Sequence, residues 1–360
     1  MITEPLKAPF PYFGGKRRAA PKVWQILGDV GNYVEPFCGS MAVLLARPPH
    51  HKGHTETVND ADGWLINAWR AIQLDPETTS LHAAGPVSEV DYHAQLAWLQ
   101  SHRDEYISWL EGDPEHYDPK LAGWWLRVIA AGVGDPFSPG PWHVVDGHLV
   151  KSQRGESGVM RGLPHLGTSG AGVNRQLPDD AGSGPGVIRN LPHLGNSGRG
   201  VNRQLNHTPD STKQQKIHHY LNTLSRRIEN TRITCGDWRR VLTNAPLHAG
   251  KPTHQVGVFL DPPYEVSGNL YAVTNHSKTT TISQEVRAWC RDEAPVDQGI
   301  KIILCGYENE HDELLQHGWH KTVGAHTTGG YVKDKTREGK TENLWLSPAC
   351  EDPDKAGTLF

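Results

Sequence analysis

The chain has 360 residues, of which 36% are hydrophobic, and its 36 basic and 40 acidic residues leave a net charge of −4. This length can bury a sizeable core and supports one large domain or two ordinary ones. Because no stretch approaches about 18 consecutive apolar residues and residues 1–22 hold no apolar signal segment, we expect no membrane span and a cytoplasmic protein.

Cysteine and histidine patterns give no sign of a metal site or a disulfide framework. The five cysteines are Cys38, Cys235, Cys290, Cys305 and Cys350, and none is part of a C-x-x-C pair. The 21 histidines contain no H-E-x-x-H motif. We therefore expect free buried thiols, no structural zinc and histidines that are exposed or hydrogen-bonded.

The first notable segment is Pro-Tyr-Phe-Gly-Gly-Lys at residues 11–16. Tyr12 offers an aromatic wall, the glycines allow a close backbone approach, and Lys16 supplies one cation. The segment lacks the first glycine and the Ser/Thr of a P-loop, so a nucleoside triphosphatase is a poor interpretation. A carboxylate-bearing cofactor near Lys16 fits better.

A strand, a glycine turn and a helix are predicted next, with the strand at 32–37 and the helix beginning at 41–46. Glu35 and Gly39 fall in this unit, which has the layout that brings a nucleoside-type ligand close to backbone. Asn59-Asp60 follows the next predicted strand, at 56–58, and lies about 20 residues after Gly39, where an acidic residue commonly binds ribose hydroxyls. The spacing strengthens a signal that is weak on its own.

Residues 65–131 are rich in tryptophan and predict a helical subdomain whose tryptophans belong to its core. Apolar residues at helical spacing mark one stripe at Leu96, Leu99, Tyr106 and Leu110, and a second at Ile217, Leu221, Leu224 and Ile228. Further strands are predicted at 232–235, 256–260 and 300–305. Strands alternating with helical patterns indicate an α/β domain that is interrupted in the middle.

Basic charge is concentrated in residues 151–227, which hold eleven Lys and Arg residues, the last two being Arg226 and Arg227, against four acidic ones. The rest of the chain is correspondingly acidic. This asymmetry is expected if the segment meets phosphates, and a solvated loop is the alternative.

The basic segment contains an internal repeat. Residues 158–177 recur at 186–205 with four mismatches in twenty positions. Twelve glycines between Gly155 and Gly200 predict an irregular segment, and two Asn-Arg-Gln triplets offer side chains that read purines in the major groove. We expect the repeat to serve DNA binding.

The apolar run 256–260 predicts a buried strand, and Asp261-Pro262-Pro263-Tyr264 follows it directly. Proline has no backbone N–H, so the Asp261 carboxylate and the Pro262 carbonyl can both accept hydrogen bonds from an exocyclic amino group. Tyr264 could stack on the base that carries this group. An ordinary strand-ending turn is the alternative.

Taken together, these residues resemble the Dam-type DNA adenine-N6 methyltransferases of bacteria and their phages. The resemblance rests on four motifs in the family's order, namely 12–16, 35–40, 59–60 and 261–264, with further likeness at 236–238 and 304–307. The Pro-His-Leu-Gly repeats also resemble those of phage-borne members.

The resemblance implies an S-adenosylmethionine-dependent enzyme that methylates N6 of adenine in double-stranded DNA, as in restriction-modification systems, by base flipping and direct transfer. It implies a Rossmann-like class I methyltransferase sheet in the α/β class, built from residues 1–62 and 213–350. Target recognition would lie in the inserted residues 63–212, helical at 63–133 and Gly-rich at 155–206, and 351–360 would form a tail.

The same resemblance assigns the site residues. The catalytic residues would be Asp261, Pro262, Pro263 and Tyr264, and the cofactor would be bound by Tyr12, Lys16, Glu35, Gly39, Asp60, Asp237 and Asp261, with no metal. Cys38 would be structural, and the absence of a Pro-Cys dipeptide argues against thiolate-dependent cytosine-C5 methylation.

Other interpretations stay open at this point. Cytosine-N4 or RNA amino-group methylation would use a similar tetrapeptide, although aspartate at its first position favours adenine in DNA. Another interpretation is a non-catalytic DNA-binding protein that keeps this fold, and failure to bind S-adenosylmethionine would favour it.

Overall fold

The computed structural model describes residues 5–12, 14–50, 55–85, 88–132, 136–137, 142–145, 148–151, 213–248, 255–264, 276–326 and 341–351. The Gly-rich repeats, Phe13 and residues 352–360 lie outside this part of the chain.

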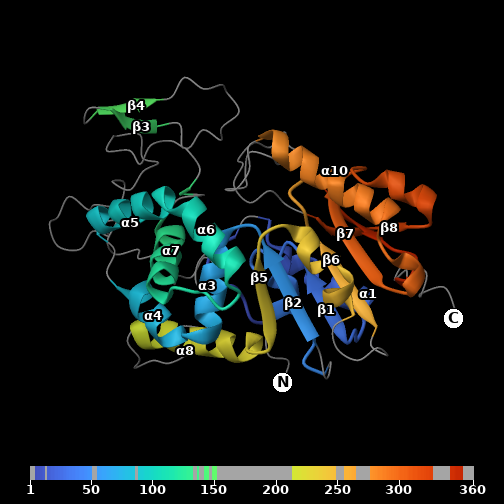
Figure 1. Ribbon diagram of the computed structural model, residues 1–360, viewed down its shortest axis with the longest axis horizontal. Coiled ribbons are helices and arrows are strands. Elements are labelled where there is room, and N and C mark those ends of the chain that lie inside the picture. The colour runs from blue at the N-terminus through green and yellow to red at the C-terminus, as the bar shows by residue number, and fades with distance from the viewer. Residues whose placement is uncertain are drawn as a thin grey trace, which may run out of the picture.

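A seven-stranded sheet forms the centre of the protein, in the order β5-β2-β1-β6-β7-β9-β8 (Figure 1). Its strands are β1 (Asn32–Glu35), β2 (Thr55–Asp60), β5 (Thr231–Cys235), β6 (Val256–Leu260), β7 (Lys301–Tyr307), β8 (His320–His326) and β9 (Thr341–Leu346). Strands β5, β2, β1, β6 and β7 are parallel, and β9 runs antiparallel to β7 and β8. The expected Rossmann-like α/β fold is confirmed. The strand order reverses between β1 and β6, where open α/β sheets bind ligands.

The five predicted strands are all present, with small shifts at their ends. The first stops at Glu35 because Pro36 has no N–H to give to the ladder. Strands β8 and β9 were missed by the sequence reasoning.

Alternate residues of the central strands pack into two separate cores. Tyr33 and Phe259 join the core on the side of α1 (Ala20–Leu27) and α2 (Ala42–Leu45). Val34 and Val258 join the core on the side of Trp238 and of α10 (His276–Asp292). Because helices cover both faces, the central strands β1 and β6 are buried at every position.

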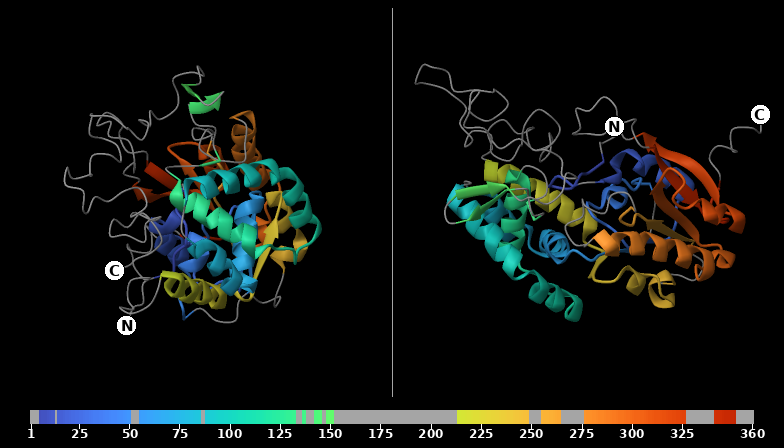
Figure 2. Two further views of the ribbon diagram at one scale, coloured as in Figure 1. Left: turned by 90° about the vertical axis from the view of Figure 1, so that its left-hand side faces the viewer. Right: turned by 90° about the horizontal axis from the view of Figure 1, so that it is seen from above.

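A group of helices packs beside the β5 edge of the sheet (Figures 1 and 2). It comprises α3 (Gly63–Leu74), α4 (Pro76–Ala84), α5 (Glu89–Ser101), α6 (Arg103–Gly112), α7 (Pro119–Ala131) and α8 (Lys213–Ile228). Trp64, Trp69 and Trp125 are buried as predicted, whereas Trp109 is 53% exposed.

The two predicted helix stripes have different outcomes. The stripe on α8 is continuous, with Leu221, Leu224 and Ile228 buried. The upstream stripe is divided between two helices, because the chain turns at His102 between Leu99 of α5 and Tyr106 of α6.

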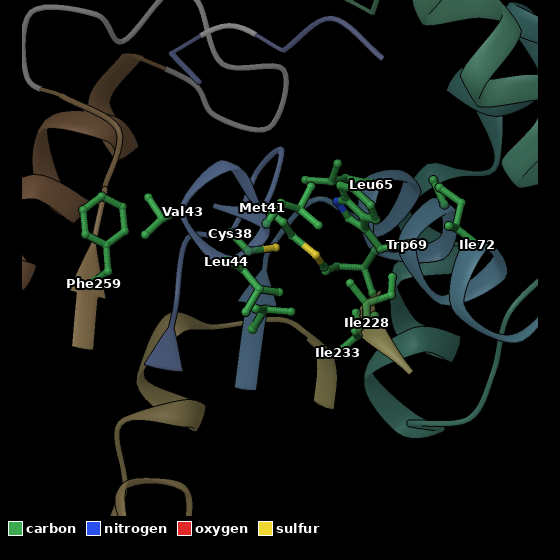
Figure 3. Close-up of a cluster of buried hydrophobic side chains, with 14 of the residues drawn as sticks. Cys38, Met41, Val43, Leu44, Leu65, Trp69, Ile72, Ile228, Ile233 and Phe259 are labelled. Atoms are coloured by element: carbon green, nitrogen blue, oxygen red, sulfur yellow. The ribbon is translucent and has the colours of Figure 1, made fainter. Parts of the chain in front are cut away.

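The helical group shares its core with the turn that follows β1. Cys38 and Met41 of this turn belong to the same buried cluster as Trp69 of α3, Ile228 of α8 and Ile233 of β5 (Figure 3). The conformation of the turn therefore depends on packing against α3 and α8.

Shorter elements complete the described structure. They are the 3-10 helices η1 (Lys16–Arg18), η4 (Trp238–Val241), η6 (Val296–Gln298) and η7 (Asp312–His317), the helix α9 (Asn244–Leu247), and a hairpin of β3 (Trp142–Val145) and β4 (His148–Lys151). None of the helices among the described residues has the length and apolar character needed to cross a membrane. All five cysteines are buried and unpaired, as expected.

Candidate functional site

Lys16 is the buried cation of the site. It opens η1 directly after Gly15, and the positive φ of 77° at Gly14 turns the chain just before this point. Its Nζ donates to the Gly14 carbonyl at 2.8 Å and lies 2.7 Å from Asp261 Oδ2. The fold thus joins the N-terminal Gly-Gly-Lys segment to the tetrapeptide after β6.

Asp261 stands at the carboxyl end of β6, beside the reversal of strand order. Its Oδ1 accepts a hydrogen bond from the Tyr264 hydroxyl at 2.9 Å. Burial raises the pKa of Asp261 to about 6, although the neighbouring Lys16 ammonium opposes the rise. Its side chain is 16% exposed, so one edge of the carboxylate can reach a ligand.

Tyr264 packs inside the site. It is 1% exposed and meets the Tyr307 ring edge-on, with 4.4 Å between the ring centroids. Lys16 Nζ lies 5.1 Å from the Tyr264 ring centroid, within cation–π range. In this conformation the ring has no free face for an incoming base.

Glu342 on β9 is a site residue that the sequence reasoning missed. Its Oε1 lies 3.1 Å from Lys16 Nζ and accepts a hydrogen bond from the Tyr264 hydroxyl at 2.6 Å. The available signal was a single carboxylate two residues before the apolar run 344–346, within a strand that was itself missed.

Gly39 and Tyr12 form a close contact at the turn after β1. Gly39 has a φ of 44°, and a Cβ placed on it would stand 2.5 Å from Tyr12 Cε1. Trp69 of α3 fixes this turn from the other side, since its indole N–H donates to the Gly39 carbonyl at 3.0 Å. The buried Gly39 backbone is therefore packed directly against an aromatic ring.

Asp60 ends β2 next to this turn. Its carboxylate accepts from the backbone N–H groups of Gly39 and Asp62, each at 3.0 Å. Burial raises the pKa of Asp60 to about 6, against the effect of these hydrogen bonds. The neighbouring Asn59 is fully buried and donates to the carbonyls of Pro36 and Gly236, which ties together three strand ends.

Glu35 and Asp237 have hydrogen-bond partners of their own. Glu35 is buried and accepts a hydrogen bond from the Tyr33 hydroxyl at 3.0 Å, and burial raises its pKa. Asp237 follows β5 and accepts from the Arg239 backbone N–H at 2.8 Å. It adjoins Gly236, whose N–H donates to the Asp60 carbonyl at 3.0 Å, so Asp237 lies near the Asp60 end of the site.

Thiol and metal chemistry have little support at this site. Burial raises the pKa of the Cys38 thiol, which disfavours the thiolate. In the part of the chain that the structure describes, no three His, Cys, Asp or Glu residues gather as they would around a metal ion.

Arg227 corrects one detail of the predicted phosphate-binding segment. Instead of facing solvent, its guanidinium donates to both carboxylate oxygens of Glu56, at 2.8 and 3.0 Å, and to the Leu44 carbonyl at 2.7 Å. The end of α8 packs against the sheet, so this cation serves the fold.

Comparison with known families gives one match. Residues 12–106 match the family described as D12 class N6 adenine-specific DNA methyltransferase. The matched range includes Tyr12, Lys16, Gly39 and Asp60 and continues into α6. No curated protein matches the chain.

Proposed function

We propose a specific reaction for this chain, whose residues 12–106 match the D12 class N6 adenine-specific DNA methyltransferases. In this reaction a methyl group passes from S-adenosylmethionine directly to N6 of an adenine that has been extruded from double-stranded DNA. The family supports adenine methylation of DNA, and the donor, the base flipping and the residue roles are our proposal. Because the protein would act on DNA, we expect it in the cytoplasm of a bacterial or phage-infected cell.

The observation that carries this proposal is the 2.7 Å contact between Lys16 and Asp261. Asp261 lies outside the matched residues 12–106, yet its side chain meets the lysine of the matched segment. A site assembled from both segments can hold a methyl donor and an amino group side by side.

The turn after β1 suits S-adenosylmethionine as the donor. Gly39 lets the Tyr12 ring pack directly against its backbone, where a Cβ would clash, and Tyr12 stays 37% exposed beside the turn. Asp60 presents a half-buried carboxylate at the end of β2, where ribose hydroxyls are bound in related sheets. Lys16 supplies a cation for a carboxylate, and Asp237 stands near the Asp60 end. When bound, the donor supplies an electrophilic methyl group on a sulfonium.

Asp261 and Pro262 would hold the acceptor nitrogen. Each carries an oxygen able to accept one N–H of an amino group, and the two prolines after Asp261 leave no backbone N–H to compete for these acceptors. Accepting both hydrogens directs the nitrogen lone pair toward the methyl carbon. Tyr264 would stack on the adenine only after a neighbouring group moves, because its ring is buried here.

The helical residues from 63 onward would belong to the target-recognition insertion, and residues 1–62 and 213–350 to the catalytic domain. The insertion supports the donor site directly, since Trp69 of α3 donates to the Gly39 carbonyl. DNA phosphates would meet the basic residues between 151 and 226, most of which lie outside the described residues.

Methyl-labelled S-adenosylmethionine and unmethylated double-stranded DNA test the reaction. After incubation with the protein, the DNA is digested and the labelled nucleoside is identified. We expect label on N6-methyladenine, and an Asp261→Ala protein should leave the DNA unlabelled while keeping its circular dichroism spectrum. Label on N4-methylcytosine, or no label with the wild-type protein, would reject the proposal.

A further inference from the structure

Glu342 places a second carboxylate against the Lys16–Asp261 pair. It lies on β9 directly across from Tyr307 of β7, and its side chain is 6% exposed. Burying a carboxylate costs free energy unless the charge is paired, so the partners of Glu342 indicate what it does.

Among the described residues, two side chains lie within hydrogen-bond distance of both carboxylates. Lys16 Nζ lies within reach of Asp261 Oδ2, Glu342 Oε1 and the Gly14 carbonyl. The Tyr264 hydroxyl has a single hydrogen, yet it lies 2.9 Å from Asp261 Oδ1 and 2.6 Å from Glu342 Oε1. It cannot donate to both oxygens at once, so the arrangement is best satisfied when one carboxyl carries a proton.

The net charge of Lys16, Asp261 and Glu342 also favours the uptake of one proton by a carboxyl. Lys16 contributes one positive charge and the two carboxylates contribute two negative charges, which leaves an excess of one negative charge in a buried site. Asp261 and Lys16 alone would be neutral. We propose that Glu342 is a positioning residue that offsets the charge of Lys16 and thereby keeps Asp261 basic enough to receive the proton released from the methylated nitrogen.

This role rests on the proposed function, in which the proton released from the methylated nitrogen needs an acceptor. The N6 nitrogen forms a bond to the methyl carbon while the carbon–sulfur bond breaks and its electron pair goes to sulfur. The nitrogen then carries a positive charge until one N–H proton leaves. An Asp261 oxygen takes that proton, and the group of Lys16, Asp261 and Glu342 changes from a net charge of −1 to zero.

Other titratable groups face the two carboxylates from the surrounding elements. In the described part of the chain these are Lys16 from η1, Tyr264 after β6, Cys305 and Tyr307 from β7, and Glu35 from β1. Burial raises the pKa of the Cys305 thiol and the pKa of the Tyr307 hydroxyl, so neither group carries charge near neutral pH. Glu342 is thus the carboxylate that shares Lys16 with Asp261.

Carboxyl titration tests the inference without any catalysis. Protein labelled with ¹³C at aspartate carboxyl groups is titrated by NMR without added donor or DNA, and an Asp261→Asn protein identifies the Asp261 signal. We expect Glu342→Gln to lower the midpoint of the Asp261 titration by about one pH unit or more, because a like charge has been removed. Glu342→Asp, which withdraws the charge slightly, should lower it by less.

The control is Glu89→Gln on α5, whose side chain is 89% exposed, and it should leave the Asp261 midpoint unchanged. An unchanged Asp261 midpoint in Glu342→Gln would overturn the inference. If that protein does not fold, an unchanged midpoint in Glu342→Asp would overturn it equally.

Single-turnover methyl transfer across pH gives a second readout. In Glu342→Gln the acid limb of the rate profile should move to lower pH together with the Asp261 midpoint, and the plateau rate should fall about tenfold or more because the base is weaker. A rate that falls equally at every pH, with no movement of the limb, would indicate a merely structural role and contradict the proposal. A wild-type protein that transfers no methyl group, combined with a lowered Asp261 midpoint in Glu342→Gln, would reject the reaction and leave the coupling of the two carboxylates standing.

Discussion

The ammonium of Lys16 and the carboxylate of Asp261 meet at 2.7 Å in a buried position, although one lies near the N-terminus and the other follows β6. Their contact joins the segment at η1 to the loop that follows β6. A buried ion pair depends on both partners, because each compensates the cost of removing the other's charge from water.

Lys16→Met should therefore be severe. Without the ammonium, two carboxylates remain close together in a buried site, and Asp261 will hold its proton at neutral pH. We expect methyl transfer to fall by about 100-fold or more, since protonated Asp261 is a weaker hydrogen-bond acceptor and cannot take up the proton. Single-turnover assays at pH 7 measure this loss.

Lys22→Met is the matched control for Lys16. This lysine lies on α1 and donates to Thr322 Oγ1 and to the Val323 carbonyl at the outer edge of the sheet. Its removal should leave the transfer rate close to wild type. A wild-type rate in Lys16→Met would show that the ion pair is dispensable.

Gly39→Ala should weaken binding of the methyl donor by about tenfold or more, which corresponds to about 1.4 kcal/mol. The added Cβ would stand 2.5 Å from the Tyr12 ring, and the φ of 44° strains any residue with a side chain. Isothermal titration calorimetry with S-adenosylmethionine measures the change.

Gly299→Ala is the control for Gly39→Ala, because it introduces backbone strain without a steric clash. Its φ is 75°, and a Cβ there would meet no atom within 4 Å, so we expect lower stability with unchanged donor affinity. Should Gly39→Ala bind the donor like the wild-type protein, the turn after β1 would not be the donor site.

His311 should make the fold sensitive to acid. It is fully buried between Cys305 and Trp345, and burial lowers its pKa from 6.5 to about 4. As pH falls below about 6.5, the unfolded chain takes up a proton that the folded protein refuses, so stability is lost as pH falls. The free energy of unfolding should drop by up to about 3 kcal/mol between pH 6.5 and 4 from this residue.

Urea unfolding at a series of pH values measures this dependence. His311→Gln removes the ionisable group and should flatten the profile in that range, whereas the exposed His93→Gln should not. Identical slopes in His311→Gln and wild type would mean that another group is responsible for the acid sensitivity.

Arg70→Met should loosen the helical group. The buried guanidinium donates to the carbonyls of Ile233, Asp113 and His116 at 3.0–3.1 Å and so joins β5 to the segment after α6. Leaving several buried carbonyls without a donor should cost about 3 kcal/mol of unfolding free energy. The exposed Arg226→Met should change it by less than about 0.5 kcal/mol, and a similarly small effect of Arg70→Met would contradict the role of this residue.

Local sequence patterns were sufficient for much of the architecture. The apolar run 256–260 predicted β6 with its observed ends, and the stripe from Leu221 to Ile228 predicted the buried face of α8. Both signals come from neighbours along the chain, whose spacing reflects one secondary structure. The upstream stripe was misjudged because two short helices can continue one periodic pattern across the turn at His102.

The sequence by itself determined the kinds of residue at the site: a Gly-Gly-Lys segment, a glycine turn, an acid at the end of β2 and the tetrapeptide from Asp261 to Tyr264. Only the tertiary structure decided which of them touch. It brought Lys16 and Asp261 together, buried Tyr264, paired Arg227 with Glu56 and delivered Glu342 on a strand that local patterns did not reveal. These contacts join residues far apart in the chain, and their geometry is set by strand order, register and packing, which no local pattern contains.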